Sequence, residues 1–167
     1  AVSMTHSLGM PSGVVTDGMG FMYNGCMGAF DPRPGMPHSI GPGKRRFTAM
    51  CPTIVFKCDD PYVVVGAPGG TFITMGVLQA ILNVMDFDMT MLEAVAAPRI
   101  TANSNTIDFS NRIPHFVTDE LASRGYPIER NPFGYVFAGV HGIRIPGGNR
   151  KWDGGADPGR DGMALEV

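Results

Sequence analysis

The sequence YVVVGAPGGT, residues 62–71, gives the clearest local indication of the fold. An apolar strand at 62–66 ends in Pro68-Gly69-Gly70, and a helix from Thr71 to about Met85 follows, with an apolar stripe of Ile73, Val77, Ile81 and Val84. Two glycines let the backbone approach another group closely, and the first N–H groups of a helix have no partner inside it. The turn is therefore a candidate site for an anion or for the oxyanion of an acyl transfer, although a glycine turn needed for packing explains it too.

The segments around this stretch predict an α/β domain in which helices are layered on sheets. A strand at 53–57 and the turn at 58–61 come before it, and Thr90 to Glu93 forms a capping box for a second helix that Pro98 ends. Strands followed by helices and then by more strands are typical of this class. The other expected elements are a helix from Thr118 to Gly125, strands at 1–8, 139–145 and 162–166, and turns at Gly147-Gly148 and Gly154-Gly155.

Composition limits the classes of function. The 167 residues suit one domain, and 44% hydrophobic residues supply a core. The net charge of −2 and the pI of about 6.1 give none of the basic surface that nucleic-acid-binding proteins carry, so we expect no nucleic-acid partner. The best apolar run, 76–85, is interrupted by Gln79 and Asn83, which argues against a membrane span.

Neither the cysteines nor the glycine-rich segments indicate a cofactor. Cys26, Cys51 and Cys58 match no zinc template and are expected to be free, small, buried residues, and unpaired thiols favour a reducing, cytoplasmic compartment over an exported one. The Walker phosphate-loop pattern fails around Gly43-Lys44, and GAPGG at 66–70 is not a dinucleotide fingerprint. We therefore expect no metal ion, nucleotide or other cofactor.

Several segments, in the same order, resemble one enzyme family. They are GPGKRRFTAMCPTIVF (41–56), VVVGAPGGTFITMGVLQAILNVMDF (63–87), EAVAAPRI (93–100) and DPGRDGMA (157–164), and the opening AVSMTHSL agrees as well. The chain resembles the small subunit of the γ-glutamyltranspeptidases, which are N-terminal-nucleophile hydrolases. The resemblance implies an αββα sandwich of two β-sheets between helix layers. It also implies that 1–167 is a single domain, the C-terminal part of an autoprocessed precursor whose large subunit is the partner, in a heterodimer or a dimer of heterodimers.

The resemblance further implies a chemistry. In this family an N-terminal Thr, freed by self-cleavage, attacks an amide carbonyl with its own α-amine as base, and the acyl-enzyme then reacts with water or an amine. Gly69 and Gly70 correspond to the glycines whose N–H groups bind the oxyanion, and Ser7 falls where the family has a Thr that hydrogen-bonds the nucleophile. The nucleophile itself would lie upstream of Ala1, because Ala has no nucleophilic side chain and Thr5 aligns with the following strand.

The residues that would hold the substrate depart from the family pattern. Met27-Gly28-Ala29-Phe30 stands where the family has Met-Asp-Asp-Phe, so the carboxylate that binds the α-ammonium of a glutamyl group is missing. Thr48-Ala49 replaces the paired serines that bind the α-carboxylate and keeps one hydroxyl of two. Asn24 is kept, whereas Gly9 replaces an Asn and Cys26 a polar residue. We expect an amide hydrolase whose acyl group is not simply γ-glutamyl, or is held by other residues.

Two hypotheses of function follow. The first is the small subunit of an autoprocessed, γ-glutamyltransferase-like amidohydrolase or acyltransferase that acts on a small-molecule amide. The second is a non-catalytic structural or binding subunit that kept the fold and lost the nucleophile. Retention of both the Gly69-Gly70 turn and the Ser7 hydroxyl favours the enzyme, because these features have little reason to coexist otherwise.

Overall fold

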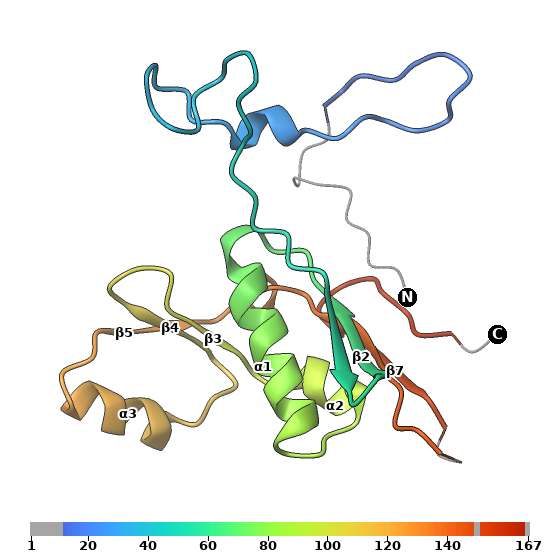
Figure 1. Ribbon diagram of the computed structural model, residues 1–167. Coiled ribbons are helices and arrows are strands. Elements are labelled where there is room, and N and C mark those ends of the chain that lie inside the picture. Colours follow the sequence, from blue (N-terminus) through green and yellow to red (C-terminus); the bar gives the residue numbers. More distant parts are fainter. Residues whose placement is uncertain (1–11, 149–150, 166–167) are drawn as a thin grey trace. The chain divides into compact units, whose positions relative to one another are not determined.

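The computed structural model describes residues 12–148 and 151–165, which form two compact units (Figure 1). The first unit begins at Met50 in the described part of the chain, and the second comprises residues 12–49 there. The first unit carries both described sheets and the α-helices. The strand expected at 1–8 lies outside the described residues, and a single domain over 1–167 stays a prediction.

A four-stranded antiparallel sheet forms the centre of the first unit. Strands β1 and β2 make the hairpin that the sequence predicts at 53–66, and Cys58 in its turn has a φ of 58°. The edge beside β2 is extended by β6 and then β7, so that the order is β1-β2-β6-β7. The bounds of the strands are Thr53–Lys57 for β1, Asp60–Gly66 for β2, His141–Arg144 for β6 and Asp153–Ala156 for β7.

Two helices pack on one face of this sheet (Figure 1). The helix predicted after the glycine turn is a 3₁₀ turn, η2 (Gly70–Phe72), continued by α1 (Ile73–Met85). Helix α2 (Met91–Ala96) begins at the predicted capping box, in which Glu93 accepts from the Thr90 N–H and donates its own N–H to the Thr90 hydroxyl. The core holds three of the four stripe residues and comprises Val63, Val65, Ile73, Val77, Ala80, Val84, Met91, Ala94, Val95 and Val140.

A second, three-stranded sheet belongs to the same unit and was not expected from the sequence. Its order is β3-β4-β5, and the parallel strands β4 and β5 are connected through α3 (His115–Ser123). The strands are too short for an alternating pattern to stand out: β3 is Ile100–Thr101, β4 is Ile107–Ser110 and β5 is Ile128–Asn131.

The start predicted for the third helix, at Thr118, is wrong by three residues. Helix α3 begins at His115, directly after Pro114, whose extended ψ of 144° ends the preceding loop. Thr118 is buried inside the first turn, where its hydroxyl donates to the His115 carbonyl. A threonine that resembles an N-cap in the sequence thus satisfies its hydroxyl within the helix instead.

The expectations for the C-terminal segment need two further corrections. Gly154 and Gly155 lie inside strand β7 and do not form a turn. A Cβ at Gly155 would stand 2.6 Å from the Met91 carbonyl oxygen, so glycine is needed there because the backbone of α2 lies directly on the strand. The strand predicted at 162–166 is absent from the described residues 162–165, because β7 already occupies the sheet edge beside β6.

The sheet face opposite the two helices carries apolar side chains that are exposed to solvent. Ile54, Val64 and Ile143 are cross-strand neighbours, and Ile54 and Ile143 are 41% and 44% exposed. Phe56, farther along β1, is 56% exposed. In a layered α/β architecture such a face is normally covered by another layer.

The described residues of the second unit, 12–49, form loops and one short helix. The segment 12–23 folds back on itself through a bridge between Val15 and Met22, and the 3₁₀ helix η1 (Cys26–Ala29) follows. Within the proline- and glycine-rich stretch 31–43, residues 31–39 form a closed loop, in which the Asp31 N–H donates to the His38 carbonyl. Among the described residues of both units, no helix is long and apolar enough to cross a membrane.

Replacing Gly155 by Ala tests the close contact between α2 and β7. The added methyl group meets backbone atoms of Met91 and Leu92 that cannot move independently, so we expect the free energy of unfolding to fall by about 1–3 kcal/mol. Gly134→Ala is the matched control, because a Cβ there meets nothing within 4 Å. Thermal and urea denaturation measure both variants, and equal stability of the two would contradict the contact.

Candidate active site

The turn between β2 and α1 presents two backbone N–H groups. Gly69 has a φ of 148° and Gly70 a φ of 58°, which are left-handed values that favour glycine. Within 12–148 and 151–165, neither glycine N–H donates to an acceptor. Gly70 is exposed and Gly69 half-buried. The arrangement can donate two hydrogen bonds to a negatively charged oxygen, which is the chemistry that the sequence predicts for this turn.

The two glycines differ in what surrounds them. A Cβ at Gly69 would lie 2.7 Å from the Cα of Ala138, and next to this contact the Gly139 N–H donates to the Pro68 carbonyl at 3.0 Å. A Cβ at Gly70 would meet nothing within 4 Å. Packing therefore explains the glycine at 69 but not the one at 70, whose open side leaves room for a bound molecule.

Two arginines donate hydrogen bonds to the carbonyl groups of Phe137 and Ala138, the second of which contacts Gly69. Arg99 Nη1 donates to the Ala138 carbonyl at 2.7 Å, and Arg160 Nη2 donates to the Phe137 carbonyl at 3.4 Å. Arg99 also forms an ion pair of 2.6 Å with Asp157, and both side chains are about nine-tenths buried, at 9% and 11% exposed. Sequence reasoning assigned these residues no role, although Arg99 lies in EAVAAPRI and the other two in DPGRDGMA.

The candidate substrate-binding residues that are described all belong to the second unit. The Asn24 side-chain oxygen accepts from the Cys26 N–H at 3.0 Å, and this bond brings those two residues together. Ala29, which ends η1, is half-buried. Thr48 is exposed and Ala49 half-buried, on the segment that leads to β1. The two remaining candidates lie outside the described residues: Ser7 and Gly9.

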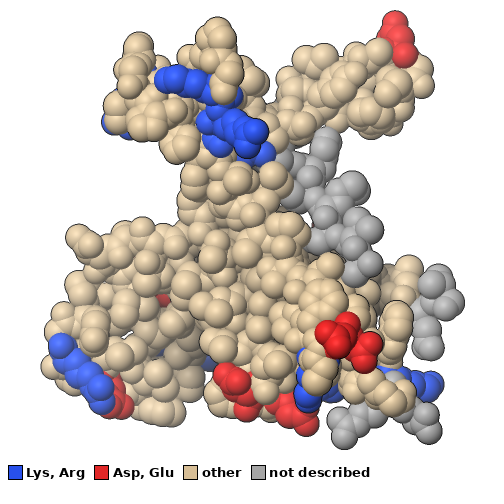
Figure 2. Space-filling model, in the orientation of Figure 1, with Lys and Arg blue, Asp and Glu red and all other residues tan. Residues whose placement is uncertain are grey.

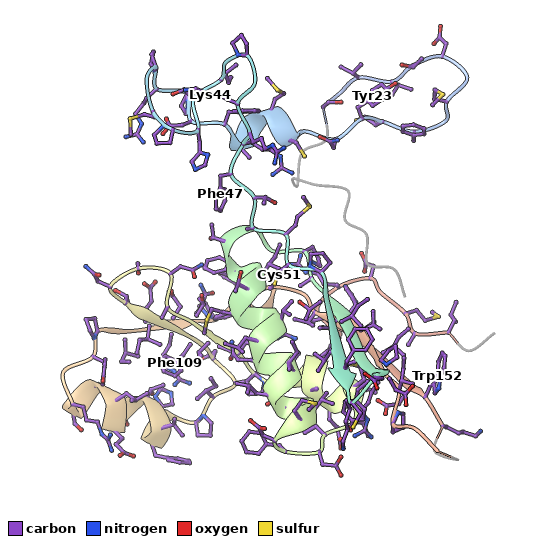
Figure 3. All side chains as sticks on the ribbon, in the orientation of Figure 1. Tyr23, Lys44, Phe47, Cys51, Phe109 and Trp152 are labelled. Carbon is purple, nitrogen blue, oxygen red and sulfur yellow. The ribbon has the colours of Figure 1, made fainter. Side chains whose placement is uncertain are left out.

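The cysteines are free, as predicted, but none of the three is fully buried. Cys26 and Cys51 are half-buried, and Cys51 packs against the core at the start of β1 (Figure 3). Cys58 is exposed, so its predicted burial is wrong, because the tight turn between β1 and β2 carries it out of the sheet. In the part of the chain that the structure describes, no group of three or more His, Cys, Asp or Glu side chains could hold a metal ion.

The second unit is the more basic of the two parts of the chain. Its described residues include four basic side chains (Arg33, Lys44, Arg45, Arg46) against two acidic ones (Asp17, Asp31). Figure 2 shows the basic side chains predominating on the visible face of this unit. Arg33 hydrogen-bonds Asp31 and thereby lowers the pKa of that carboxyl, so the cluster at 44–46 carries the excess positive charge. This charge suits an anionic ligand group.

Comparison with known proteins identifies the family. The family model described as γ-glutamyltranspeptidase matches residues 1–167. The chain belongs to the γ-glutamyltranspeptidase family. Membership confirms the prediction from the quoted segments, and it places the chain among the N-terminal-nucleophile hydrolases.

Individual relatives agree with this assignment. The chain is 40% identical over 119 residues to the acylase ACY 1 proenzyme of Pseudomonas sp. (strain V22), covering 71% of this chain and 21% of that protein. It is 33% identical over 157 residues to the glutathione hydrolase proenzyme of Bacillus subtilis (strain 168), covering 93% of this chain and 26% of that protein. The chain thus spans about a fifth to a quarter of the length of these two relatives.

A solved structure confirms the predicted fold class. A mutant of Helicobacter pylori γ-glutamyltranspeptidase superposes with a TM-score of 0.81 at 33% identity, over 95% of this chain and 92% of that one. The mixed α/β architecture, with helices layered on sheets, is therefore that of this family.

Substitution of Gly70 by Val tests whether the substrate occupies the open space beside Gly70 during the reaction. We expect amide-cleaving activity to fall at least about 100-fold, because the side chain fills the space beside the two N–H donors, one of which it also displaces. Gly147→Val is the matched control: Gly147 also has a positive φ, of 68°, and open surroundings, so backbone strain is similar. Steady-state kinetics would contradict the assignment if both variants lost activity equally.

Proposed function

We propose that this chain is the small subunit of an autoprocessed, γ-glutamyltransferase-like amidohydrolase or acyltransferase, acting through an acyl-enzyme on an N-terminal Thr upstream of Ala1. The observation that supports the proposal most is the Gly69-Gly70 turn, whose two N–H groups donate to no acceptor within the described residues and which has open space at the Cβ position of Gly70. Relatives named glutathione hydrolase and acylase, both as proenzymes, support a reaction at an amide bond.

In the proposed mechanism the α-amine of the Thr takes the proton of its own hydroxyl as the oxygen attacks the amide carbonyl. The carbonyl oxygen becomes an oxyanion and accepts hydrogen bonds from the N–H groups of Gly69 and Gly70. The proton passes to the leaving amine, which departs as the carbonyl re-forms in the acyl-enzyme. Water or an acceptor amine then attacks the ester carbonyl and gives up a proton through the α-amine to the Thr oxygen. The bond between that oxygen and the acyl carbon breaks, so the free acid or the new amide departs and the Thr hydroxyl is restored. Ser7 is proposed to hydrogen-bond the nucleophile.

The proposed substrate is an amide whose acyl group ends in a carboxylate. The positive charge of the second unit, and the hydroxyl retained at Thr48, favour such a group. Ala29 offers no partner for an α-ammonium, and the charge-assisted hydrogen bond that is lost is worth about 1.5–3 kcal/mol. A plain dicarboxylic acyl group, such as glutaryl, should therefore compete well with γ-glutamyl. Asn24, Cys26, Ala49 and Gly9 are proposed as further residues of this pocket.

The proposed partner is the large subunit of the same precursor. These two curated relatives are proenzymes about four to five times as long as their matched part, so they contain the chain length that a second subunit needs. The apolar sheet face of Ile54, Phe56 and Ile143 is a surface on which such a subunit would pack.

Covalent labelling tests the proposed function. An electrophilic glutamine analogue, incubated with the protein purified from its complete gene, should add one equivalent of mass to the small chain, and peptide mapping should place that mass on its N-terminal Thr. Absence of any mass addition, together with no amide hydrolysis, would instead make the chain a non-catalytic binding or structural subunit.

Substrate preference tests the role of Ala29. The p-nitroanilides of γ-glutamate and of glutarate differ only in the α-ammonium, so the ratio of their kcat/KM values isolates its recognition. We expect Ala29→Asp to raise the γ-glutamyl to glutaryl ratio about 10- to 100-fold, in line with a charge-assisted hydrogen bond. Met27→Asp is the control, because it adds a carboxylate to the same short helix at an exposed position where the family has no acidic residue. An unchanged ratio in Ala29→Asp would contradict the pocket assignment.

A further inference from the structure

The glycine turn packs against a buried segment, residues 137–140, which lies outside the regular strands. Residues 137–140 connect η3 (Gly134–Val136) to β6, and Phe137, Ala138 and Val140 are at most 3% exposed. Gly69 lies just before the helix, and Gly76 lies in its first half. A Cβ added at either glycine would be within 3 Å of an atom of Ala138. The position of Ala138 therefore sets the position of the turn.

The side chains of Arg99 and Arg160 donate hydrogen bonds to carbonyl groups of this segment. The planar guanidinium of Arg99 donates to the Ala138 carbonyl, to the Val95 carbonyl in α2 and to the Asp157 carboxylate, so one group joins three segments of the chain. The stem of Arg160 lies against Gly139, where a Cβ would be 2.4 Å from the Arg160 Cγ. Without these donors the carbonyls of Phe137 and Ala138 would lose hydrogen bonds in a buried place.

Asp157 keeps Arg99 in this position. A buried guanidinium without a counter-charge is unfavourable, and Asp157 supplies that charge at 2.6 Å while its other oxygen accepts from the Gly159 N–H at 2.7 Å. The carboxylate is thereby fixed at both oxygens. A chain of contacts runs from Asp157 through Arg99 and Ala138 to Gly69, and every link in it is buried or half-buried.

We infer that Arg99 and Asp157 are positioning residues for the N–H groups of Gly69 and Gly70. The inference rests on the proposed function, in which those groups bind the oxyanion. Hydrogen bonds to an oxyanion contribute to the transition state and little to substrate binding. Displacement of the turn by a fraction of an ångström therefore lowers kcat and leaves KM nearly unchanged.

The test compares two Arg–Asp pairs in the same fold. Arg99→Lys and Asp157→Asn break the pair behind the turn. Arg144→Lys and Asp153→Asn break a pair of similar geometry, with Arg144 Nε 2.7 Å from Asp153 Oδ2, where Asp153 accepts from the Met91 N–H at the start of α2. All are made in the complete precursor, and kinetics are normalised to the amount of processed small chain measured by intact mass.

The expected results separate positioning from stability. Arg99→Lys and Asp157→Asn should lose about 10- to 100-fold in kcat with KM within about 3-fold of wild type, whereas the control variants keep kcat within about 3-fold although they too lower Tm. Affinity for a boronic acid substrate analogue, which becomes a tetrahedral anion on the nucleophile, should fall in parallel with kcat. Affinity for an unreactive competitive inhibitor should not change.

Each alternative result has a distinct meaning. Wild-type protein that neither hydrolyses amides nor accepts the covalent label overturns the proposed function and this inference with it. Active wild type together with Arg99 and Asp157 variants that behave like the controls overturns the positioning role alone. If neither variant folds, Arg160→Lys provides the test: it keeps the stem over Gly139, loses the bond to the Phe137 carbonyl, and should lower kcat about 3- to 10-fold.

Discussion

The backbones of Gly69 and Ala138 are in direct contact, and this contact limits how far the glycine turn can lie from the segment that precedes β6. Only a hydrogen atom fits between them at position 69, and at Gly76 the same alanine approaches within 2.8 Å of a Cβ position. Small residues at these places allow α1 to lie close to the segment that leads into β6. Within the described residues, the turn between the helix and the sheet keeps two N–H groups that donate to no acceptor.

The parts of the fold that the sequence predicts are those with local signals. The hairpin of β1 and β2, the helix after the glycines and the Thr90–Glu93 capping box are each defined by neighbours within a few residues. Strands β3 to β5 are too short to show a pattern. A glycine in a sequence is ambiguous, because it can indicate either a turn or a place where two backbones lie close together. Gly155 is the second case, since the backbone of α2 packs directly on it.

The candidate site was predictable to a different degree in its two parts. Gly69 and Gly70 are evident because a strand ends and a helix begins at one place. Arg99 and Asp157 carry no such signal, since their pairing joins segments that are distant in the sequence and its effect on the turn passes through Ala138. Ala29 and Thr48-Ala49 could be compared with a family pattern, but a sequence does not report what else lines the pocket.

The buried pair of Arg99 and Asp157 also has a consequence for the order of folding. Contacts close in sequence form quickly, and those that close long loops form late. The β1–β2 hairpin and α1 can form while the chain is still being synthesised, but the support behind Gly69 requires the carboxylate of Asp157, which is synthesised long after Gly69. A nascent polypeptide in which Asp157 has not yet been synthesised therefore holds the residues of the turn without their final geometry.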